Sequence, residues 1–218
     1  MNRRWKIAQA AEIRWWKSYL KDKNPDDYLA KKRLYWLKTL RELDFHLEKG
    51  TSVLDAGCGP AGIFLILKDH QVVAIDPLLL QYEKDIQHFS QSQFPWVAFQ
   101  PETIEGFNSP KQFDTVFCLN VINHVADLQS SLDNLIRLTK TGGDLIITVD
   151  AHNHHILKKI FQIIPGDILH PQQYSQLDYC AMFRERKCEI HKSQKLKHQF
   201  IFDYWAFWLK KSVVNSPM

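Results

Sequence analysis

Long apolar runs and patterned cysteines are both missing from this sequence. No stretch approaches the roughly 18 apolar residues of a membrane-spanning helix, and the polar start MNRRWKIAQAAE has no signal-peptide core. The four cysteines form neither a CxxC pair nor another metal-ligand spacing. These absences predict a soluble, cytoplasmic protein with reduced thiols, no membrane span and no metal site.

Positive charge is scarce in the middle of the chain and abundant at its ends. Residues 1–49 carry 13 Lys/Arg against 7 Asp/Glu, residues 183–211 carry 8 against 3, and residues 50–182 carry 7 against 14. Basic ends can attract RNA, a membrane surface or an anionic metabolite, although Lys and Arg often only solvate a helix face. Since no RRM or KH motif is present, we expect no nucleic-acid partner.

The first 49 residues predict two aromatic-rich helices. Residues 3–21 lack Pro and Gly and carry apolar side chains at helical spacing. Asn24 is suited to cap a second helix that Pro25 opens, and the apolar positions that follow predict a helix running to Gly50. We therefore expect an N-terminal helical element, 1–49, ahead of a second unit, 50–218.

From Thr51 onward, short apolar runs alternate with helix-length segments, which is typical of a parallel sheet with crossover helices. The expected strands are 52–56, 72–76, 96–100, 113–120 and 144–150, and the expected helices are 60–70, 79–92, 127–140, 154–164 and 175–186. Residues 188–196 and 198–211 predict a closing antiparallel pair. The fold class is α/β, with a doubly wound sheet.

Three glycines and one acid predict a nucleotide site. Gly57, Gly59 and Gly62 match GxGxxG after the first strand, and Asp76 ends the next strand, 19 residues after Gly57, where an acid can bind ribose hydroxyls. A carboxylate at Asp55 would repel a pyrophosphate but attract an ammonium group. The pattern thus favours a nucleoside that carries an amino acid over NAD, which remains an alternative.

The segment VLDAGCGPAG, residues 53–62, resembles motif I of class I S-adenosylmethionine-dependent methyltransferases. The resemblance continues in order through VVAIDP, PETIEGF, FDTVFCLNVINHVAD and GGDLIITVD, and the pattern is similar to small-molecule methyltransferases of the ubiquinone-biosynthesis type. It implies a mostly parallel seven-stranded sheet, a lid formed by residues 1–49, and methyl transfer to a small-molecule acceptor. Asn120 departs from it, because many relatives have Glu there, and so does Pro101.

The resemblance also implies cofactor roles. Asp55 and the turn at Gly57, Cys58 and Gly59 would hold the methionine part of S-adenosylmethionine. The remaining implied contacts are Asp76 and Pro77 at the ribose, Glu102, Thr103 and Ile104 at the adenine, and Cys118, Leu119 and Asn120 beside the reacting methyl.

Candidate acceptor residues come from several parts of the chain. His124 is the candidate general base, with Asn120 beside it, because an imidazole with a pKa near 6.5 can take a proton at neutral pH. The candidate substrate contacts are Trp16, Tyr19, Tyr28 and Tyr35 in the N-terminal helices, and His152, His170 and Tyr174 after the fifth strand. For each of them, ordinary packing is the competing interpretation.

Two other functions remain open at this point. An RNA or protein methyltransferase could dock through its basic ends, although no NPPY-like run follows the fourth strand. A noncatalytic module could keep the fold and the cofactor. The sequence also allows a homodimer.

Overall fold

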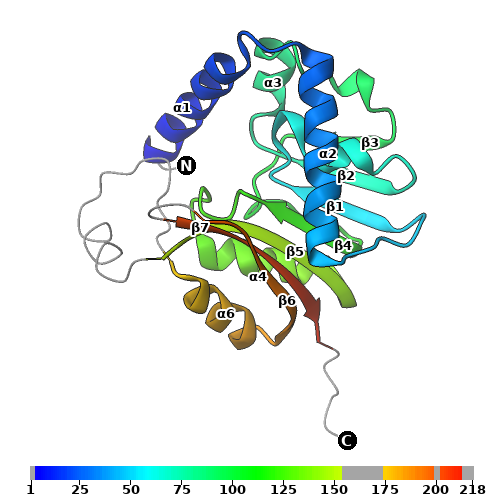
Figure 1. Cartoon of the computed structure of the whole chain (residues 1–218), viewed down its shortest axis with the longest axis vertical. Coiled ribbons are helices and arrows are strands. Elements are labelled where there is room, and N and C mark those ends of the chain that lie inside the picture. The colour runs from blue at the N-terminus through cyan, green and yellow to red at the C-terminus, as the bar shows by residue number, and fades with distance from the viewer. Residues whose placement is uncertain (1–2, 154–173, 199–201, 213–218) are drawn as a thin grey trace, which may run out of the picture.

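A seven-stranded sheet runs through the computed structural model, which describes residues 3–153, 174–198 and 202–212 (Figure 1). The strands are β1 (Ser52–Ala56), β2 (Gln71–Ile75), β3 (Val97–Gln100), β4 (Phe113–Leu119), β5 (Thr139–His152), β6 (Cys188–His198) and β7 (Phe202–Lys211). Their spatial order is β3-β2-β1-β4-β5-β7-β6. The neighbouring pairs from β3 to β5 are parallel, and β7 is antiparallel to both β5 and β6. The predicted α/β class and the closing antiparallel pair are confirmed.

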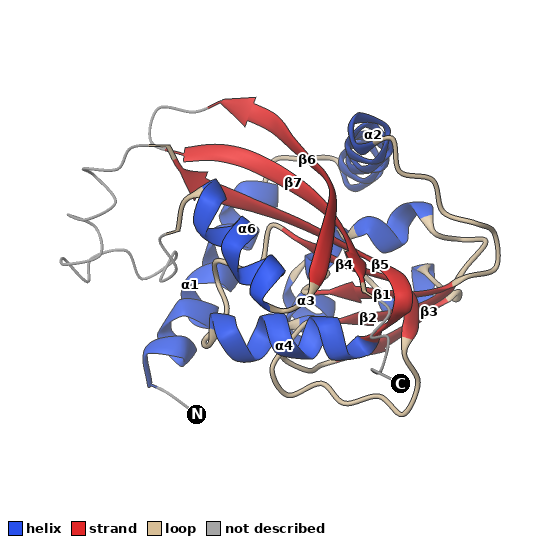
Figure 2. Cartoon of the chain, turned by 90° about the horizontal axis from the view of Figure 1, so that it is seen from below, coloured by secondary structure: helices blue, strands red, loops and turns tan. Residues whose placement is uncertain are grey.

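Helices cover both faces of this sheet. The helices are α1 (Arg3–Leu20), α2 (Pro25–Leu43), α3 (Leu79–Asp85), α4 (Leu128–Leu138) and α6 (Gln176–Glu185). Buried side chains of α2 and α3 join one hydrophobic cluster, and those of α4 and α6 join the other. Figure 2 shows α2 on one side of the sheet and α4 and α6 on the other. The central strands are therefore buried on both faces, which is why they read as continuous apolar runs.

The second N-terminal helix starts where the sequence predicts and ends earlier than expected. The Oδ1 of Asn24 accepts hydrogen bonds from the backbone N–H groups of Asp26 and Asp27 at 3.0 and 3.1 Å. The helix ends at Leu43 because Asp44 adopts a left-handed conformation with φ 56°, and the next residue, Phe45, turns back into the core. The prediction that this helix runs to Gly50 is wrong.

The first crossover is not the α-helix predicted for 60–70. Two short 3₁₀ turns, η1 (Gly59–Ala61) and η2 (Ile63–Ile66), replace it, with an extended Gly62 between them. Pro60 suits the first turn of a helix, but Gly62 is extended, with ψ −175°, and glycine has a helix preference about 1 kcal/mol poorer than that of alanine, so the helical turns stop at Ala61 and start again at Ile63. Helix α2 packs against η2 and supplies the cover that a longer crossover helix would give.

The remaining helices agree with the sequence to different degrees. Helix α6 follows Ser175, whose side chain forms a capping box with Asp178, close to the predicted 175–186. Helix α3 ends at Asp85, well before residue 92, and α4 ends at Leu138 instead of running to the glycines at 142 and 143, which lie inside β5. The helix predicted for 154–164 lies outside the described residues.

Candidate active site

The glycine-rich turn ties β1 to its neighbours at the carboxyl edge of the sheet. The N–H groups of Gly57 and Cys58 both donate to the carbonyl of Ile75, at 2.8 and 3.0 Å. Gly57 has φ 72°, and a Cβ atom there would lie 2.4 Å from the side chain of Val121. Only glycine satisfies both constraints, because it accepts a positive φ and leaves room for Val121.

The charges of Asp55 and Lys32 act on each other beneath this turn. Asp55, in β1, is 2% exposed, and its Oδ2 accepts a hydrogen bond from the Phe64 N–H at 3.1 Å. Burial raises the pKa of Asp55 to about 7, against the opposing effect of the Phe64 hydrogen bond and the Lys32 charge. Lys32 comes from α2, and burial lowers its pKa to about 8 while the charge of Asp55 raises it. The ammonium of Lys32 lies 4.4 Å from the ring centroid of Trp36.

Asp76 directly follows β2, and both of its carboxylate oxygens accept hydrogen bonds from backbone donors. Its Oδ2 accepts from Gly59 N–H at 3.0 Å and its Oδ1 from Leu78 N–H at 2.8 Å. Burial, followed by the nearby charge of Glu12, raises the pKa of Asp76 to about 7. The neighbouring Pro77 is half-buried. Asp76 is thus fixed against the glycine turn, as a ribose-binding acid would need to be.

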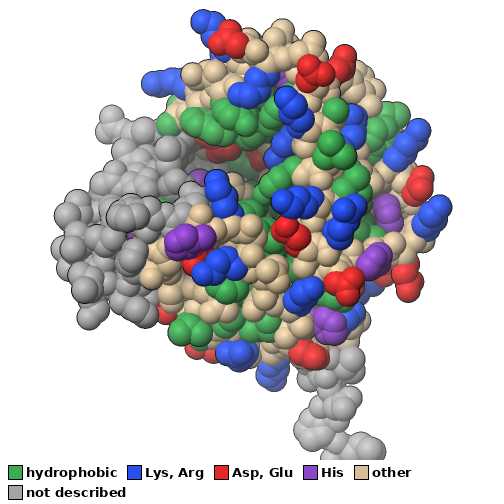
Figure 3. All heavy atoms as spheres, in the orientation of Figure 1, with side chains coloured by type: hydrophobic (Ala, Val, Ile, Leu, Met, Phe, Trp, Pro, Cys, Tyr) green, Lys and Arg blue, Asp and Glu red, His purple; other side chains and the backbone are tan. Residues whose placement is uncertain are grey.

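Helix α1 lies over this end of the site. A Cβ atom on Gly59 would be 3.8 Å from the ring of Trp16, so the indole covers the glycine turn. The Oε1 of Glu12 accepts hydrogen bonds from Trp16 Nε1 at 3.4 Å and from the hydroxyl of Tyr82 at 3.2 Å. Figure 3 shows the surface hollowed beside α1, with acidic side chains inside the hollow. Trp16 was predicted from the sequence, whereas Glu12 and Tyr82 were not.

The loop after β3 is built around its own hydrogen bonds. Thr103 Oγ1 accepts from Gly106 N–H at 3.0 Å, and the buried Ile104 has its carbonyl bound by Asn134 Nδ2 at 2.6 Å. Glu102 is exposed. The backbone N–H groups of Asp76 and Glu102 both donate to Gln100, at 3.3 and 2.9 Å, which places this loop beside Asp76.

The end of β4 brings a strained residue to the same edge. Cys118 and Leu119 are buried, and Asn120 is exposed with φ 59°. The Asn120 N–H donates to both the carbonyl and the Oγ1 of Thr148, at 3.0 and 2.9 Å. His124 lies half-buried in the turn that follows, with its backbone N–H bound to the carbonyl of Val121 at 2.8 Å.

The candidate tyrosines of the N-terminal helices lie in three different surroundings. Tyr19 is 43% exposed and stacks on Trp15 with the ring centroids 4.8 Å apart. Tyr28 is buried, with its ring 5.6 Å from that of His88. Tyr35 is 39% exposed and forms a side-chain hydrogen bond with Tyr204 of β7.

Two of the three candidates after β5 lie within the described residues. His152 is buried, with its ring 4.4 Å from that of Phe202. Tyr174 packs edge-to-face on Tyr179 with the centroids 5.9 Å apart. The candidate His170 lies outside the described residues.

The described part of the chain holds neither a metal-binding group nor a membrane-spanning helix. Within residues 3–153, 174–198 and 202–212, no three His, Cys, Asp or Glu side chains are grouped to hold a metal ion. Over the same ranges, no helix is both long and apolar enough to cross a membrane.

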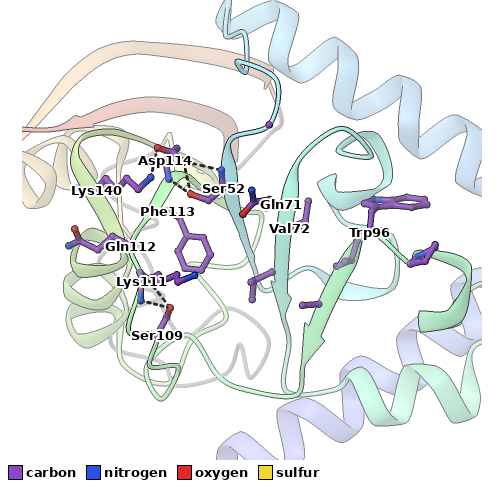
Figure 4. A pocket seen from close by; sticks show the side chains of 15 residues that line it. Ser52, Gln71, Val72, Trp96, Ser109, Lys111, Gln112, Phe113, Asp114 and Lys140 are labelled. Atoms are coloured by element: carbon purple, nitrogen blue, oxygen red, sulfur yellow. Dashed lines mark hydrogen bonds and ion pairs between the residues drawn. The ribbon is translucent and has the colours of Figure 1, made fainter.

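An open pocket of about 900 Å³ lies at the opposite, amino edge of the sheet. Figure 4 shows it between the starts of β1, β2 and β4, where Asp114 binds Ser52 and pairs with Lys140 at 2.7 Å. It is remote from Asp55 and Asp76, which lie at the carboxyl ends of their strands. In parallel sheets of this kind, ligands bind at that carboxyl edge.

This strand order, with a glycine turn after β1 and an acid after β2, defines the class I methyltransferase fold. Residues 47–203 match a family model described as a methyltransferase domain, and the chain belongs to that family. The predictions of the fold and of an S-adenosylmethionine-dependent methyltransferase are confirmed at the level of the family.

The similar proteins carry the same description. The chain is 34% identical over 98 residues to a ubiquinone biosynthesis O-methyltransferase from Rickettsia bellii, covering 44% of this chain and 40% of the relative. It is 30% identical over 144 residues to one from Paracidovorax citrulli, covering 63% and 58%. The chain therefore spans about half the length of these relatives.

Solved structures show the same fold at low identity. The YcgJ protein from Bacillus subtilis superposes with a TM-score of 0.64 at 16% identity, covering 80% of this chain and 98% of that one. The N-methyltransferase NodS from Bradyrhizobium japonicum, in complex with S-adenosylhomocysteine, has a TM-score of 0.61 at 14% identity, covering 88% and 90%.

Proposed function

We propose that this protein transfers a methyl group from S-adenosylmethionine to a small-molecule acceptor. The observation that carries the proposal is the mutual charge effect of Lys32 and Asp55 under the glycine turn, next to the Asp76 carboxylate. The amino-acid end of S-adenosylmethionine is a zwitterion. A buried acid and a half-buried base whose charges act on each other complement that charge pattern as they would not complement a pyrophosphate.

Each end of the cofactor has a matching part of the site. Asp55 faces the ammonium and Lys32 the carboxylate of the methionine, while Asp76 accepts the ribose hydroxyls. Glu102, Thr103 and Ile104 lie in the loop beside Asp76, where the adenine would lie. When bound, S-adenosylmethionine supplies an electrophilic methyl group on sulfur.

What remains for the protein is to hold the acceptor in line with the sulfur–methyl bond. Positioning of this kind can offset about 7 to 11 kcal/mol of the barrier. The end of β4, at Leu119 and Asn120, is fixed for this task by the two hydrogen bonds from Asn120 to Thr148.

Residues 1–49 act as the lid in this proposal. Trp16 of α1 covers Gly59, and Trp36 of α2 donates from its indole to the carbonyl of Ala61 at 3.0 Å. Because α1 and α2 cover the cofactor turn, a small acceptor fits the site better than a long RNA or a folded protein would. The relatives named for ubiquinone biosynthesis O-methylation support the same choice. Cytoplasmic location and a homodimer stay predictions.

A transfer assay with labelled methyl groups tests the proposal. The protein is incubated with S-adenosylmethionine labelled in its methyl group and a cell extract, which is then separated into RNA, protein and low-molecular-mass fractions. We expect label in the low-molecular-mass fraction. Label confined to RNA or protein would move the function to the alternative classes, and no labelled fraction at all would favour a noncatalytic module.

A further inference from the structure

Two polar side chains, Thr148 and Asp150, lie on one face of β5, beside the neighbouring strand β7. Asp150 is the direct cross-strand neighbour of Tyr204. Thr148 is two residues earlier on the same face, and its Oγ1 lies 2.6 Å from the Tyr204 hydroxyl. Thr148 is fully buried, and Asp150 is half-buried near the end of the strand. The polar groups therefore lie at the carboxyl edge, where the acceptor must enter.

A continuous set of hydrogen bonds joins this face to the cofactor turn. The Asn120 N–H donates to Thr148 Oγ1 at 2.9 Å, and Thr148 Oγ1 is bonded to the Tyr204 hydroxyl, which in turn bonds to Tyr35 of α2. Asn120 precedes Val121, whose side chain fills the space above Gly57. Asp150, two residues beyond Thr148 on the same face of β5, therefore lies at the same carboxyl edge as the glycine turn.

Asp150 also lies near two phenols from two different elements. Its charge acts on Tyr35 of α2 and on Tyr204 of β7, its cross-strand neighbour. Burial raises the pKa of both phenols above the ordinary value, so they stay protonated near neutral pH. They can donate hydrogen bonds there, but they cannot take up a proton.

We propose that Asp150, Tyr35 and Tyr204 form the acceptor subsite, and that Asp150 takes the proton of an acceptor whose nucleophile is an O–H or N–H group. This inference rests on the proposed methyl transfer. The acceptor's heteroatom forms a bond to the methyl carbon while the carbon–sulfur bond breaks, and the heteroatom's proton passes to the Asp150 carboxylate. The products are the methylated acceptor, S-adenosylhomocysteine and a protonated Asp150, which returns its proton to solvent.

The test replaces Asp150 and compares it with a matched acid on the same strand. Asp150→Asn keeps the shape and removes the base, while Asp144→Asn alters an acid at the other end of β5, which binds Trp208 Nε1 at 2.6 Å. Both variants are assayed for methyl transfer from labelled S-adenosylmethionine to the low-molecular-mass fraction of a cell extract, and for binding of S-adenosylhomocysteine by calorimetry.

We expect Asp150→Asn to lower transfer about 100-fold or more, in the range of general-base catalysis, with affinity for S-adenosylhomocysteine within about twofold. Asp144→Asn should stay within about threefold of the parent protein. Tyr35→Phe, which removes one hydrogen bond, should lower transfer about tenfold. Mass spectrometry of the labelled product distinguishes a methoxy from an N-methyl group.

A pH series separates a base from a merely structural residue. For an acceptor with an acidic O–H, such as a phenol, raising the pH ionises the acceptor in solution, so transfer by Asp150→Asn should recover toward that of the parent protein. Among the described residues, Tyr35, Tyr204 and His152 lie on the Asp150 side of the sheet, and His152→Gln serves as the control for the titration of that imidazole.

Three outcomes would overturn the proposal. They are full transfer by Asp150→Asn, an equal loss of S-adenosylhomocysteine binding, and, where the labelled product is a methylated phenol, a loss of transfer that no pH restores. If the parent protein labels nothing, the proposed function fails first, and this inference fails with it.

Discussion

Gly62 lies so close to Asp55 that a Cβ atom on it would be 2.4 Å from the Oδ2 of that carboxylate. The same atom would be 2.6 Å from the carbonyl oxygen of Cys58. Gly62 has an ordinary φ of −69°, so the backbone does not require glycine there. Space beside the buried acid requires it, which gives the last glycine of the motif a specific role.

Gly62→Ala should therefore displace Asp55. We expect a loss of about 1 to 3 kcal/mol in the free energy of unfolding, as overpacking usually costs, and at least tenfold weaker binding of S-adenosylhomocysteine. Gly50→Ala is the control, because Gly50 has φ 78° with nothing within 4 Å of a Cβ atom. It should cost about 1 to 2 kcal/mol through strain and leave binding unchanged. Unaltered binding by Gly62→Ala would contradict the role given to Asp55.

Lys32→Met should weaken binding of ligands that carry the amino acid. A charge-assisted hydrogen bond contributes about 1.5 to 3 kcal/mol, so the affinity for S-adenosylhomocysteine should fall about tenfold or more. Binding of 5′-methylthioadenosine, which lacks the amino-acid group, should not change. Lys38→Met is the matched control, because Lys38 pairs with Glu42 at 3.6 Å on the exposed side of α2. Equal losses for both ligands would show that Lys32 acts only on packing.

Ligand binding and folding should both depend on pH through Asp55 and Asp76. Burial raises the pKa of each carboxyl to about 7 in the ligand-free protein. Because the cationic end of the cofactor and the ribose hydroxyls favour ionised carboxylates, binding should release protons and strengthen as the pH rises from about 6 to 7.5. Calorimetry in buffers of different ionisation enthalpy measures that release.

The pH dependence of folding stability through these two carboxyls has the opposite sign to that of ligand binding. Each carboxyl has a higher pKa when folded than when unfolded, so its stabilising effect is complete below the unfolded pKa of about 4 and is lost as the pH rises through about 7. Asp55→Asn should flatten this part of the stability curve in denaturant titrations. A ligand-free protein whose stability rises steadily from pH 4 to 7 would show that other groups dominate.

The sequence predicts the sheet well because its strands are buried on both faces. Residues 52–56 and 113–120 read as strands without reference to the rest of the chain, and the structure agrees with them. The first crossover was predicted wrongly, because its apolar residues have the length of a helix while the extended Gly62 interrupts it. Helix α2 covers the sheet there, and no local sequence pattern predicts that contact.

Some residues of the site could likewise be predicted from the sequence, and others could not. Asp55, the glycines and Asp76 follow from motif spacing, since each acts within its own turn. Lys32 sits in the basic run Lys31–Arg33, and Glu12 is one acid in a basic helix, so neither carries a sequence signal. The contacts of Tyr204 with Thr148 and Tyr35 join three distant elements, and only the fold brings them together.

Calorimetric titration with S-adenosylhomocysteine and with NAD tests the central claim most directly, on the parent protein, Asp76→Ala and the control Asp69→Ala. Asp69 is an exposed acid that pairs with Lys49 at 3.9 Å before β2. We predict that the parent protein binds S-adenosylhomocysteine and not NAD. The affinity for S-adenosylhomocysteine should fall at least tenfold in Asp76→Ala, consistent with about 1.5 to 3 kcal/mol for hydrogen bonds to a charged acceptor. It should not change in Asp69→Ala. Tight binding of NAD with no heat from S-adenosylhomocysteine would contradict the account.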